Sequence, residues 1–176
     1  MKPSLVYVIG YPGSGKTTAV RSIVNGLVFR VEDKPFKHTI YSDGMVQLGY
    51  EREVFGGTDS LGFNVQPKVV SWLKDCKVPL IIGEGDRLSN NKFFTSVLEQ
   101  GWQLVIPFIY VSELLSMRRI KQRGTTFDAS WLRRTMTKVD NVANRWHHFV
   151  VPIDGSGEPS QVAESLRNVL GEHQRS

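Results

Sequence analysis

Gly10-Tyr-Pro-Gly-Ser-Gly-Lys16-Thr17 is the stretch that decides the fold of this chain. Its spacing is G-x-x-x-x-G-K-[ST], which is that of the phosphate-binding P-loop. The apolar run Leu5-Val-Tyr-Val-Ile9 precedes it, and an amphipathic stretch from Ala19 to Leu27 follows it. A strand, a glycine-rich loop and a helix in this order are the context that the motif requires. The stretch therefore predicts a site for the phosphates of a nucleoside triphosphate.

The residue types in the loop suit this chemistry. Glycines let backbone N–H groups turn inward around a polyphosphate, and the new helix adds unpaired amides and its positive dipole end. In such a loop Lys16 reaches the β- and γ-phosphates, and the Thr17 hydroxyl ligates magnesium. We therefore expect ATP and Mg²⁺ as cofactors. The predicted nucleotide-binding residues of the loop are Gly10, Pro12, Gly13, Ser14, Gly15, Lys16, Thr17 and Thr18.

The bulk properties narrow the class of protein. The chain has 176 residues of ordinary globular composition, which fits a single domain over residues 1–176. Its one cysteine, Cys76, excludes an intrachain disulfide and a cysteine-based zinc site. No apolar run reaches membrane-spanning length, and the N-terminus lacks a signal-peptide pattern. We expect a cytoplasmic protein with no membrane contact and no stable protein partner.

Short, β-rich apolar segments alternate with helical ones along the chain. Together with the P-loop, this alternation predicts an α/β, P-loop NTPase-type fold with a doubly wound, five-stranded parallel sheet. The glycine-rich stretch 45–64 is expected to be functional, because loops this long are uncommon in compact domains. The expected strands are 4–9, 38–41, 78–82, 103–110 and 149–153. The expected helices follow the P-loop to about 25, begin at 66, span 89–101 and 113–124, begin at about 128, and span 159–171.

Polar residues follow the second and third expected strands, at the edge where such sheets bind ligands. Asp43 is placed to take a proton from an acceptor hydroxyl, although Asp-Gly is also a common turn pair. Glu84 and Asp86 would hold a magnesium-bound water or orient the acceptor. Arg87 would neutralise a phosphate on the acceptor or pair with Asp86. Which of the three carboxylates is the base stays open at this point.

The positive charge is concentrated in one segment. Between residues 118 and 145 there are eight Lys or Arg against two acids, so this part carries +6 while the whole chain carries +5. A concentrated basic face indicates a phosphate-rich partner, and a solvated helix face is the alternative. Arg119 and Arg123 lie where cations close over a transferring group. Beyond them, two stripes are expected on one helix: Leu132, Met136, Val139 and Ala143; and Arg134, Lys138, Asn141 and Arg145.

Two other P-loop classes fit less well. A GTPase needs a guanine-reading N-K-x-D element, and no such tetrapeptide occurs. Asp59-Ser-Leu-Gly62 spells D-x-x-G, but it lies inside the glycine-rich stretch, and we interpret it as a coincidence. The small size argues against a motor or ring ATPase.

The chain resembles the P-loop kinases of the thymidylate-kinase and polynucleotide-kinase type. Ser42-Asp43 resembles the second-strand aspartate that polynucleotide kinases use as base. Asp86-Arg87 resembles the pair with which thymidylate kinases position the acceptor. Glu113 to Gly124 resembles the helix and lid of nucleotide kinases, which implies a helical lid over about residues 118–145. Ile153-Asp154-Gly155-Ser156 resembles the loop that packs on adenine, which implies that Asp154 binds nucleotide. The implied catalytic residues are Lys16, Asp43, Asp86, Arg87, Arg119 and Arg123, with Thr17 and Glu84 at the metal.

The run Gly57–Pro67, with Glu84–Arg87 and the Arg134/Lys138 stripe, departs from standard thymidylate kinases. It is similar to phage P-loop kinases that phosphorylate 5-hydroxymethyluracil within DNA. This resemblance implies that a hydroxymethyl oxygen attacks the γ-phosphate, giving 5-phosphomethyl-deoxyuridine, while the basic segment follows the DNA backbone and Trp131 or Trp146 stacks on a base. The alternatives are a soluble nucleoside or nucleotide kinase and a nucleotide-gated binding module without transfer activity.

Overall fold

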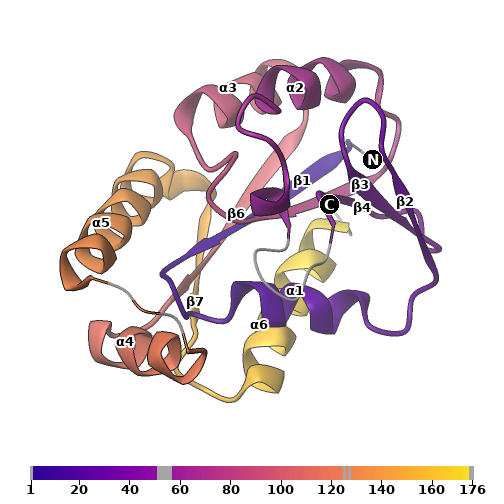
Figure 1. Ribbon diagram of the computed structural model, residues 1–176. Helices are drawn as coiled ribbons and strands as arrows, with labels where there is room; N and C mark the ends of the chain where they lie inside the picture. The colour runs from indigo at the N-terminus through magenta and orange to yellow at the C-terminus, as the bar shows by residue number, and fades with distance from the viewer. Residues whose placement is uncertain (1, 51–56, 125, 127, 175–176) are drawn as a thin grey trace.

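A computed structural model describes residues 2–50, 57–124, 126 and 128–174. Its sheet has seven strands in the order β2-β3-β4-β5-β1-β6-β7 (Figure 1). The strands are β1 Ser4–Gly10, β2 Phe29–Glu32, β3 His38–Tyr41, β4 Val46–Leu48, β5 Leu80–Glu84, β6 Gln103–Tyr110 and β7 Val150–Asp154. The helices are α1 Lys16–Val24, α2 Gln66–Asp75, α3 Asn91–Glu99, α4 Glu113–Gln122, α5 Ala129–Arg145 and α6 Pro159–Gln174, with short 3₁₀ helices η1 Thr58–Ser60 and η2 His147–Phe149.

The strand that leads into the P-loop lies within a parallel core. β4, β5, β1, β6 and β7 are parallel neighbours, and every residue of β1 is buried. A strand covered by helices on both faces has no polar side, which explains the unbroken apolar run before the loop. The predicted α/β fold is confirmed in this part of the sheet.

The predicted number of strands is wrong, because the sheet has seven strands and not five. The strand expected at 38–41 exists as β3, but it runs antiparallel to both of its neighbours, β2 and β4. β4 has only three residues and β2 is largely exposed, so neither carries the buried apolar run that marks the other strands. Both are strands because they pair with β3. As a result, the chain beyond β3 emerges at the edge opposite to the P-loop.

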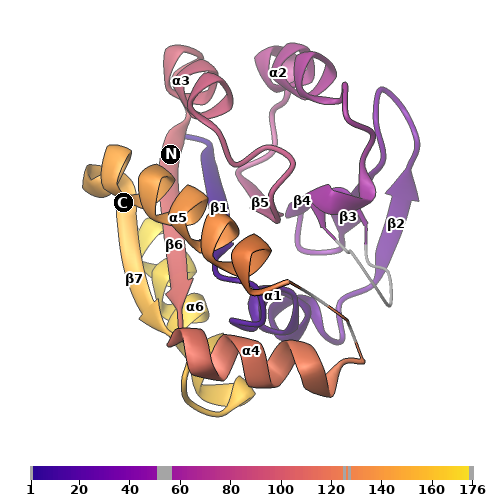
Figure 2. The same cartoon turned by 60° about the vertical axis from the view of Figure 1, so that its left-hand side comes forward.

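Helices cover the sheet on both sides (Figures 1 and 2). On one side α1 and α6 pack together and bury Val20 and Leu166 among their apolar side chains. On the other side α2, α3 and α5 contribute Val69, Phe93 and Val139 to a second apolar cluster. The central strands β1 and β5, whose residues are all buried, are therefore enclosed between two helical layers. None of the helices in the described ranges is both long enough and apolar enough to cross a membrane.

The two stripes predicted on the long helix are confirmed in α5. Leu132, Val139 and Ala143 are buried and Met136 is partly buried, while the basic stripe is exposed. The predicted end of the last helix at Gly171 is wrong, because α6 continues to Gln174. Part of the expected glycine-rich loop, residues 51–56, lies outside the described residues, as do 125 and 127 of the connection before α5.

Candidate active site

The P-loop adopts the conformation that its glycines predict. Gly13 and Gly15 have φ of 72° and 97°, a region that side chains with a Cβ disfavour, and Gly15 is followed at once by α1. Lys16 is the first residue of α1, and its Nζ donates to the carbonyls of Gly10 at 2.9 Å and Tyr11 at 3.1 Å. The buried Ser14 hydroxyl has no hydrogen-bond partner among the described residues. Unpaired donors at the start of a helix fit a polyphosphate.

A pocket of about 140 Å³ lies beside this loop. Its lining contains two cations and no acidic side chain: Gly13, Ser14, Gly15, Thr18, Arg119, Arg123, Gly155, Gly157, Pro159 and Val162. The Arg119 guanidinium donates to the carbonyls of Gly155 at 2.8 Å and Gly13 at 3.4 Å, so it joins the last loop to the P-loop. A cationic lining suits the phosphates and base of a nucleotide.

Two further residues act on this pocket through the backbone, and one of them, Asp154, was predicted from the sequence. The exposed carboxylate of Asp154 accepts the Ser156 N–H at 2.8 Å, and hydrogen bonds from Ser156 lower the pKa of Asp154. Asp154 therefore shapes the loop that lines the pocket, although its own side chain is not part of the lining. The Ser116 hydroxyl of α4 donates to the Pro12 carbonyl, which fixes α4 against the P-loop.

Thr17 and Glu84, which were both predicted at the metal, lie in direct contact. The Thr17 hydroxyl donates to Glu84 Oε1 at 3.0 Å, and Glu84 is 3% exposed at the end of β5. Burial raises the pKa of Glu84 to about 7, while the Lys16 charge and the Thr17 hydrogen bond oppose that shift. Desolvation lowers the pKa of Lys16, and the nearby Glu84 and Asp59 charges oppose it. A hydroxyl and a carboxylate beside a phosphate site are the oxygen ligands that Mg²⁺ uses in kinases.

Asp59 is a second carboxylate near Lys16 and Glu84, and the sequence analysis did not identify it. Its Oδ1 accepts the N–H groups of Asp86 at 2.8 Å and Arg87 at 3.1 Å. Gly85 between β5 and these residues has φ 111°, and a Cβ there would lie 2.8 Å from the Asp59 carboxyl carbon. The expectation that the glycine-rich loop is functional includes Asp59, but treating its D-x-x-G as a coincidence hid the residue.

Hydrogen bonds of Tyr7 and Thr58 hold the backbone on either side of the Asp59 contact in place at the end of β5. The buried Tyr7 hydroxyl donates to the Gly85 carbonyl at 3.0 Å and accepts the Leu88 N–H at 3.3 Å. The Thr58 hydroxyl, one residue before Asp59, donates to the Glu84 carbonyl at 2.8 Å. These buried hydrogen bonds explain how a glycine-rich connection holds a carboxylate beside the P-loop.

The prediction that Asp43 lies at the P-loop edge of the sheet is wrong. Asp43 is exposed in the turn between β3 and β4, where its Oδ1 accepts the Met45 N–H at 3.0 Å. Since β4 runs parallel to β5, the turn before it lies at the amino ends of the parallel strands, away from Glu84. Asp43 therefore has the turn-forming role that its Asp-Gly sequence also indicated.

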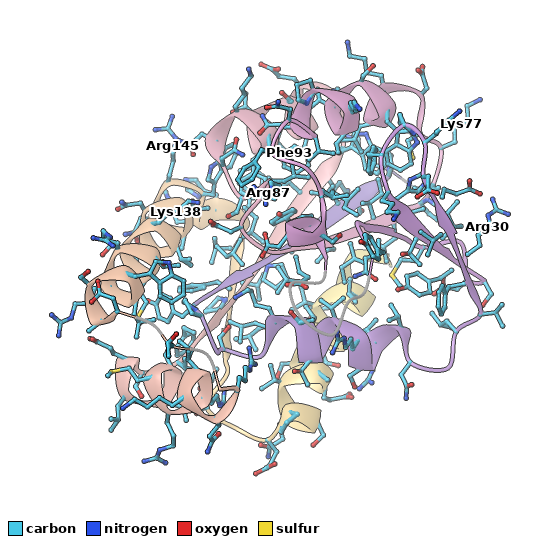
Figure 3. All side chains as sticks on the ribbon, in the orientation of Figure 1. Arg30, Lys77, Arg87, Phe93, Lys138 and Arg145 are labelled. Carbon is cyan, nitrogen blue, oxygen red and sulfur yellow. The ribbon has the colours of Figure 1, made fainter. Side chains whose placement is uncertain are left out.

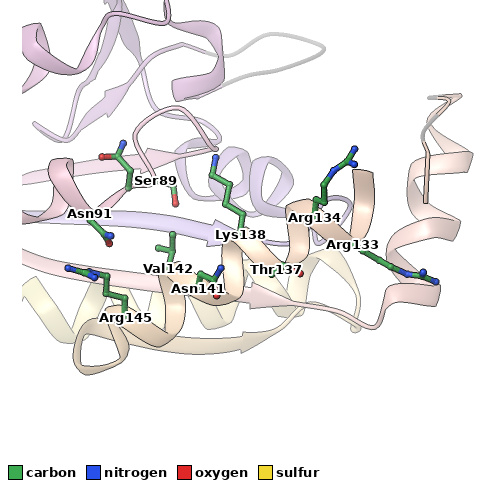
Figure 4. A pocket seen from close by; sticks show the side chains of 10 residues that line it. Ser89, Asn91, Arg133, Arg134, Thr137, Lys138, Asn141, Val142 and Arg145 are labelled. Carbon is green, nitrogen blue, oxygen red and sulfur yellow. The ribbon is translucent and has the colours of Figure 1, made fainter. Parts of the chain in front are cut away.

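A groove of about 700 Å³ lies between α5 and the start of α3 (Figure 4). Lys138 Nζ lies 2.6 Å from Asp86 Oδ2, and this ion pair joins α5 to the end of β5. Figure 3 labels the side chains of Lys138 and Arg145 on α5. The lining contains four cations and no acid: Ser89, Asn90, Asn91, Arg133, Arg134, Thr137, Lys138, Asn141, Val142 and Arg145. The predicted basic stripe thus faces a groove.

Arg87 does not pair with Asp86 as one interpretation of the sequence had it. Its guanidinium carbon lies 3.9 Å from the centre of the Phe63 ring, and its buried Nε has no hydrogen-bond partner among the described residues. Phe63 is 87% exposed. Of the two tryptophans considered for stacking, Trp146 packs edge-on against Phe94 and Trp131 is half-exposed on α5.

The fold and this arrangement of P-loop, buried acid and basic groove define a P-loop kinase. The chain belongs to the P-loop Nucleotide Kinase3 family, whose model matches residues 1–171. No curated protein matches the sequence significantly.

Solved structures with the same fold include several kinases. A gluconokinase from Sinorhizobium meliloti 1021 has a TM-score of 0.57 at 15% identity, over 98% of this chain and 93% of its own. A deoxyadenosine kinase from M. mycoides, with products dCMP and dCDP bound, has a TM-score of 0.52 at 12% identity, over 96% and 98%. The YorR protein of Bacillus subtilis, in complex with phosphorylated GDP, has a TM-score of 0.60 at 9% identity, over 98% and 99%. Identities this low establish the shared fold alone.

Proposed function

We propose that this chain transfers the γ-phosphoryl group of ATP to a hydroxyl on a nucleic-acid component, with a hydroxymethylated pyrimidine in DNA as the preferred acceptor. The observation that carries the proposal is the groove lined by four cations, one of which pairs with Asp86. Since Lys138 pairs with Asp86 and Arg133 with Glu113, phosphates on an acceptor would complement chiefly the other two cations of the lining. A polynucleotide supplies several phosphates in a row, whereas a free sugar supplies none.

On the nucleotide side, the P-loop amides and Lys16 would bind the β- and γ-phosphates. Thr17 would ligate Mg²⁺ directly and Glu84 through a water, and the ion would supply positive charge against the phosphate oxygens. Arg119 holds the two loops of the nucleotide pocket together, and the exposed Arg123 lines the same pocket. Both arginines would stabilise the negative charge on the transferring group.

On the acceptor side, we assign the role of general base to Asp59 in place of Asp43. Both amide hydrogen bonds of Asp59 go to Oδ1, and the described residues form none to Oδ2. Asp86 is committed to its ion pair with Lys138. Oδ2 of Asp59 is therefore the carboxylate oxygen best suited to accept a proton from the acceptor hydroxyl. Asp86 would then orient the acceptor.

Phe63 and Arg87 would receive the acceptor base. Arg87 covers one face of the Phe63 ring, and the side chain is otherwise 87% exposed, so a ring surface is available for stacking. We further propose that residues 1–176 act as one kinase domain in which the segment 118–145 serves as the lid over both substrates.

A transfer assay with ATP labelled at the γ-phosphate tests the proposal. The acceptors are DNA containing 5-hydroxymethyluracil, unmodified DNA of the same sequence, free nucleosides and nucleoside monophosphates. Label on the modified DNA but not on the free compounds supports the proposed acceptor. Label on a nucleoside or nucleotide alone contradicts it and favours a small-molecule nucleotide kinase. Label released only to water favours a nucleotide-gated binding module.

A further inference from the structure

The outermost strand β2 carries an exposed apolar surface at the end of the sheet opposite to β7 (Figures 1 and 2). Val28, Phe29 and Val31 are 76%, 63% and 43% exposed. Seven large apolar side chains are exposed among the described residues, and three of them fall in this four-residue stretch. In the part of the chain that the structure describes, β2 pairs with β3 and with no other strand. An apolar edge strand of this kind favours pairing with another strand.

The backbone of β2 directs hydrogen-bonding groups away from the molecule. The Ser42 N–H donates to the Val28 carbonyl at 2.8 Å, so Val28 faces the neighbouring strand. In an antiparallel pair this direction alternates from residue to residue, which turns the N–H and C=O groups of Phe29 and Val31 outward. The Tyr41 N–H, opposite Phe29, donates to the carbonyl of Met45, the residue before β4, in agreement with this alternation.

The charges on β2 are complementary to those of a second β2. Arg30 and Glu32 stand symmetrically on either side of Val31, and they form an exposed ion pair at 3.1 Å within one chain. If two copies run antiparallel with Val31 opposite Val31, each Arg30 lies opposite the Glu32 of the other copy. Opposite charges directly across a strand pair stabilise it, and like charges destabilise it. Arg30 extends from the outer edge of the molecule in Figure 3.

We propose that two copies of this chain associate through β2, joining their sheets into one continuous sheet across a two-fold axis. The outward groups of Val31 would bond to those of Val31 in the other copy, and Phe29 would bond to Asp33. The exposed side chains of Phe29 and Val31 from both copies would gather on one face of the joined sheet. Such a contact is self-complementary, as a two-fold dimer requires. Its occupant is a second copy because the charge pattern matches itself.

Sedimentation equilibrium of the full chain tests the dimer through a charge swap. We expect the wild-type chain to dimerise reversibly. Arg30→Glu would place four carboxylates on one face of the joined strands, and Glu32→Arg would place four cations there. Either change should raise the dimer dissociation constant by at least about tenfold. The double variant Arg30→Glu/Glu32→Arg restores opposite charges and should return the constant to within about threefold of wild type.

Lys68→Glu on the exposed surface of α2 makes the same change in net charge as Arg30→Glu and should leave dimerisation unchanged. Thermal unfolding of each variant checks that the monomer is folded. A wild-type chain that stays monomeric up to about 100 μM overturns the proposal. So does a dimer whose strength is equal in wild type and Arg30→Glu, or a double variant as weak as the single ones, because neither result can come from pairing through β2.

Discussion

The P-loop contacts Glu84 through Thr17 and the basic groove contacts Asp86 through Lys138, but the chain builds the loop and the groove in different ways. The P-loop takes its glycines, Lys16 and Thr17 from eight consecutive residues. The groove collects its side chains from the start of α3 and from α5, more than forty residues apart in sequence, and the Lys138–Asp86 ion pair attaches it to β5. The phosphate-binding loop is therefore a local property of the chain, whereas the groove, which is our proposed acceptor site, depends on helix packing. Each of the four predictions below tests one side of this comparison.

Removing the P-loop lysine should have the largest effect. Lys16→Ala takes away the cation nearest the phosphates that change charge during transfer, so we expect turnover to fall by at least about a hundredfold. Steady-state kinetics with saturating ATP measures this loss. Lys121→Ala, an exposed lysine on α4, is the control and should retain normal turnover. A Lys16→Ala enzyme with nearly wild-type turnover would contradict the role of the loop.

Asp59 and Asp43 can be compared directly. Asp59→Asn keeps an oxygen that accepts the two amide hydrogen bonds but removes the base, so kcat should fall by about a hundredfold while ATP affinity stays within a few-fold. Asp43→Asn alters a turn at the far edge of the sheet and should leave kcat nearly unchanged. If instead only Asp43→Asn abolished transfer, the assignment of the base to Asp59 would be wrong.

The buried Glu84 should make stability depend on pH when no metal or nucleotide is present. Its pKa is about 7 in the folded chain and near its ordinary value of 4.5 when unfolded, so the folded state holds the extra proton between these values. Stability therefore falls as pH rises through this window, and the loss is complete above pH 7. Urea unfolding at pH 5 and pH 8 should show wild type losing about 2 kcal/mol more than Glu84→Gln. Equal losses in both proteins would show that Glu84 titrates normally.

The groove should give the smallest effect and only on the acceptor side. Replacing Arg134 and Lys138 together by Ala removes two cations, so DNA affinity should weaken by about tenfold and the salt slope should fall by about two. ATP affinity should not change. The pair Lys68→Ala/Lys74→Ala on α2 removes the same charge outside the groove and serves as the control. A salt slope equal to that of wild type would show that Arg134 and Lys138 belong to an ordinary solvated helix face and do not bind DNA phosphates.

The sequence alone predicted the P-loop, the position of Glu84 at the same edge of the sheet, the stripes of α5 and the parallel strands that carry unbroken apolar runs. Each of these follows from local spacing: a motif of fixed length, a strand end, or a helical period. Only the tertiary structure showed that β3 runs antiparallel, because strand direction depends on the partner and not on the residues of the strand. That reversal carried Asp43 away from the P-loop, while the Tyr7 and Thr58 hydrogen bonds brought Asp59 to it. Long-range hydrogen bonds of this kind leave no periodic trace in a single sequence.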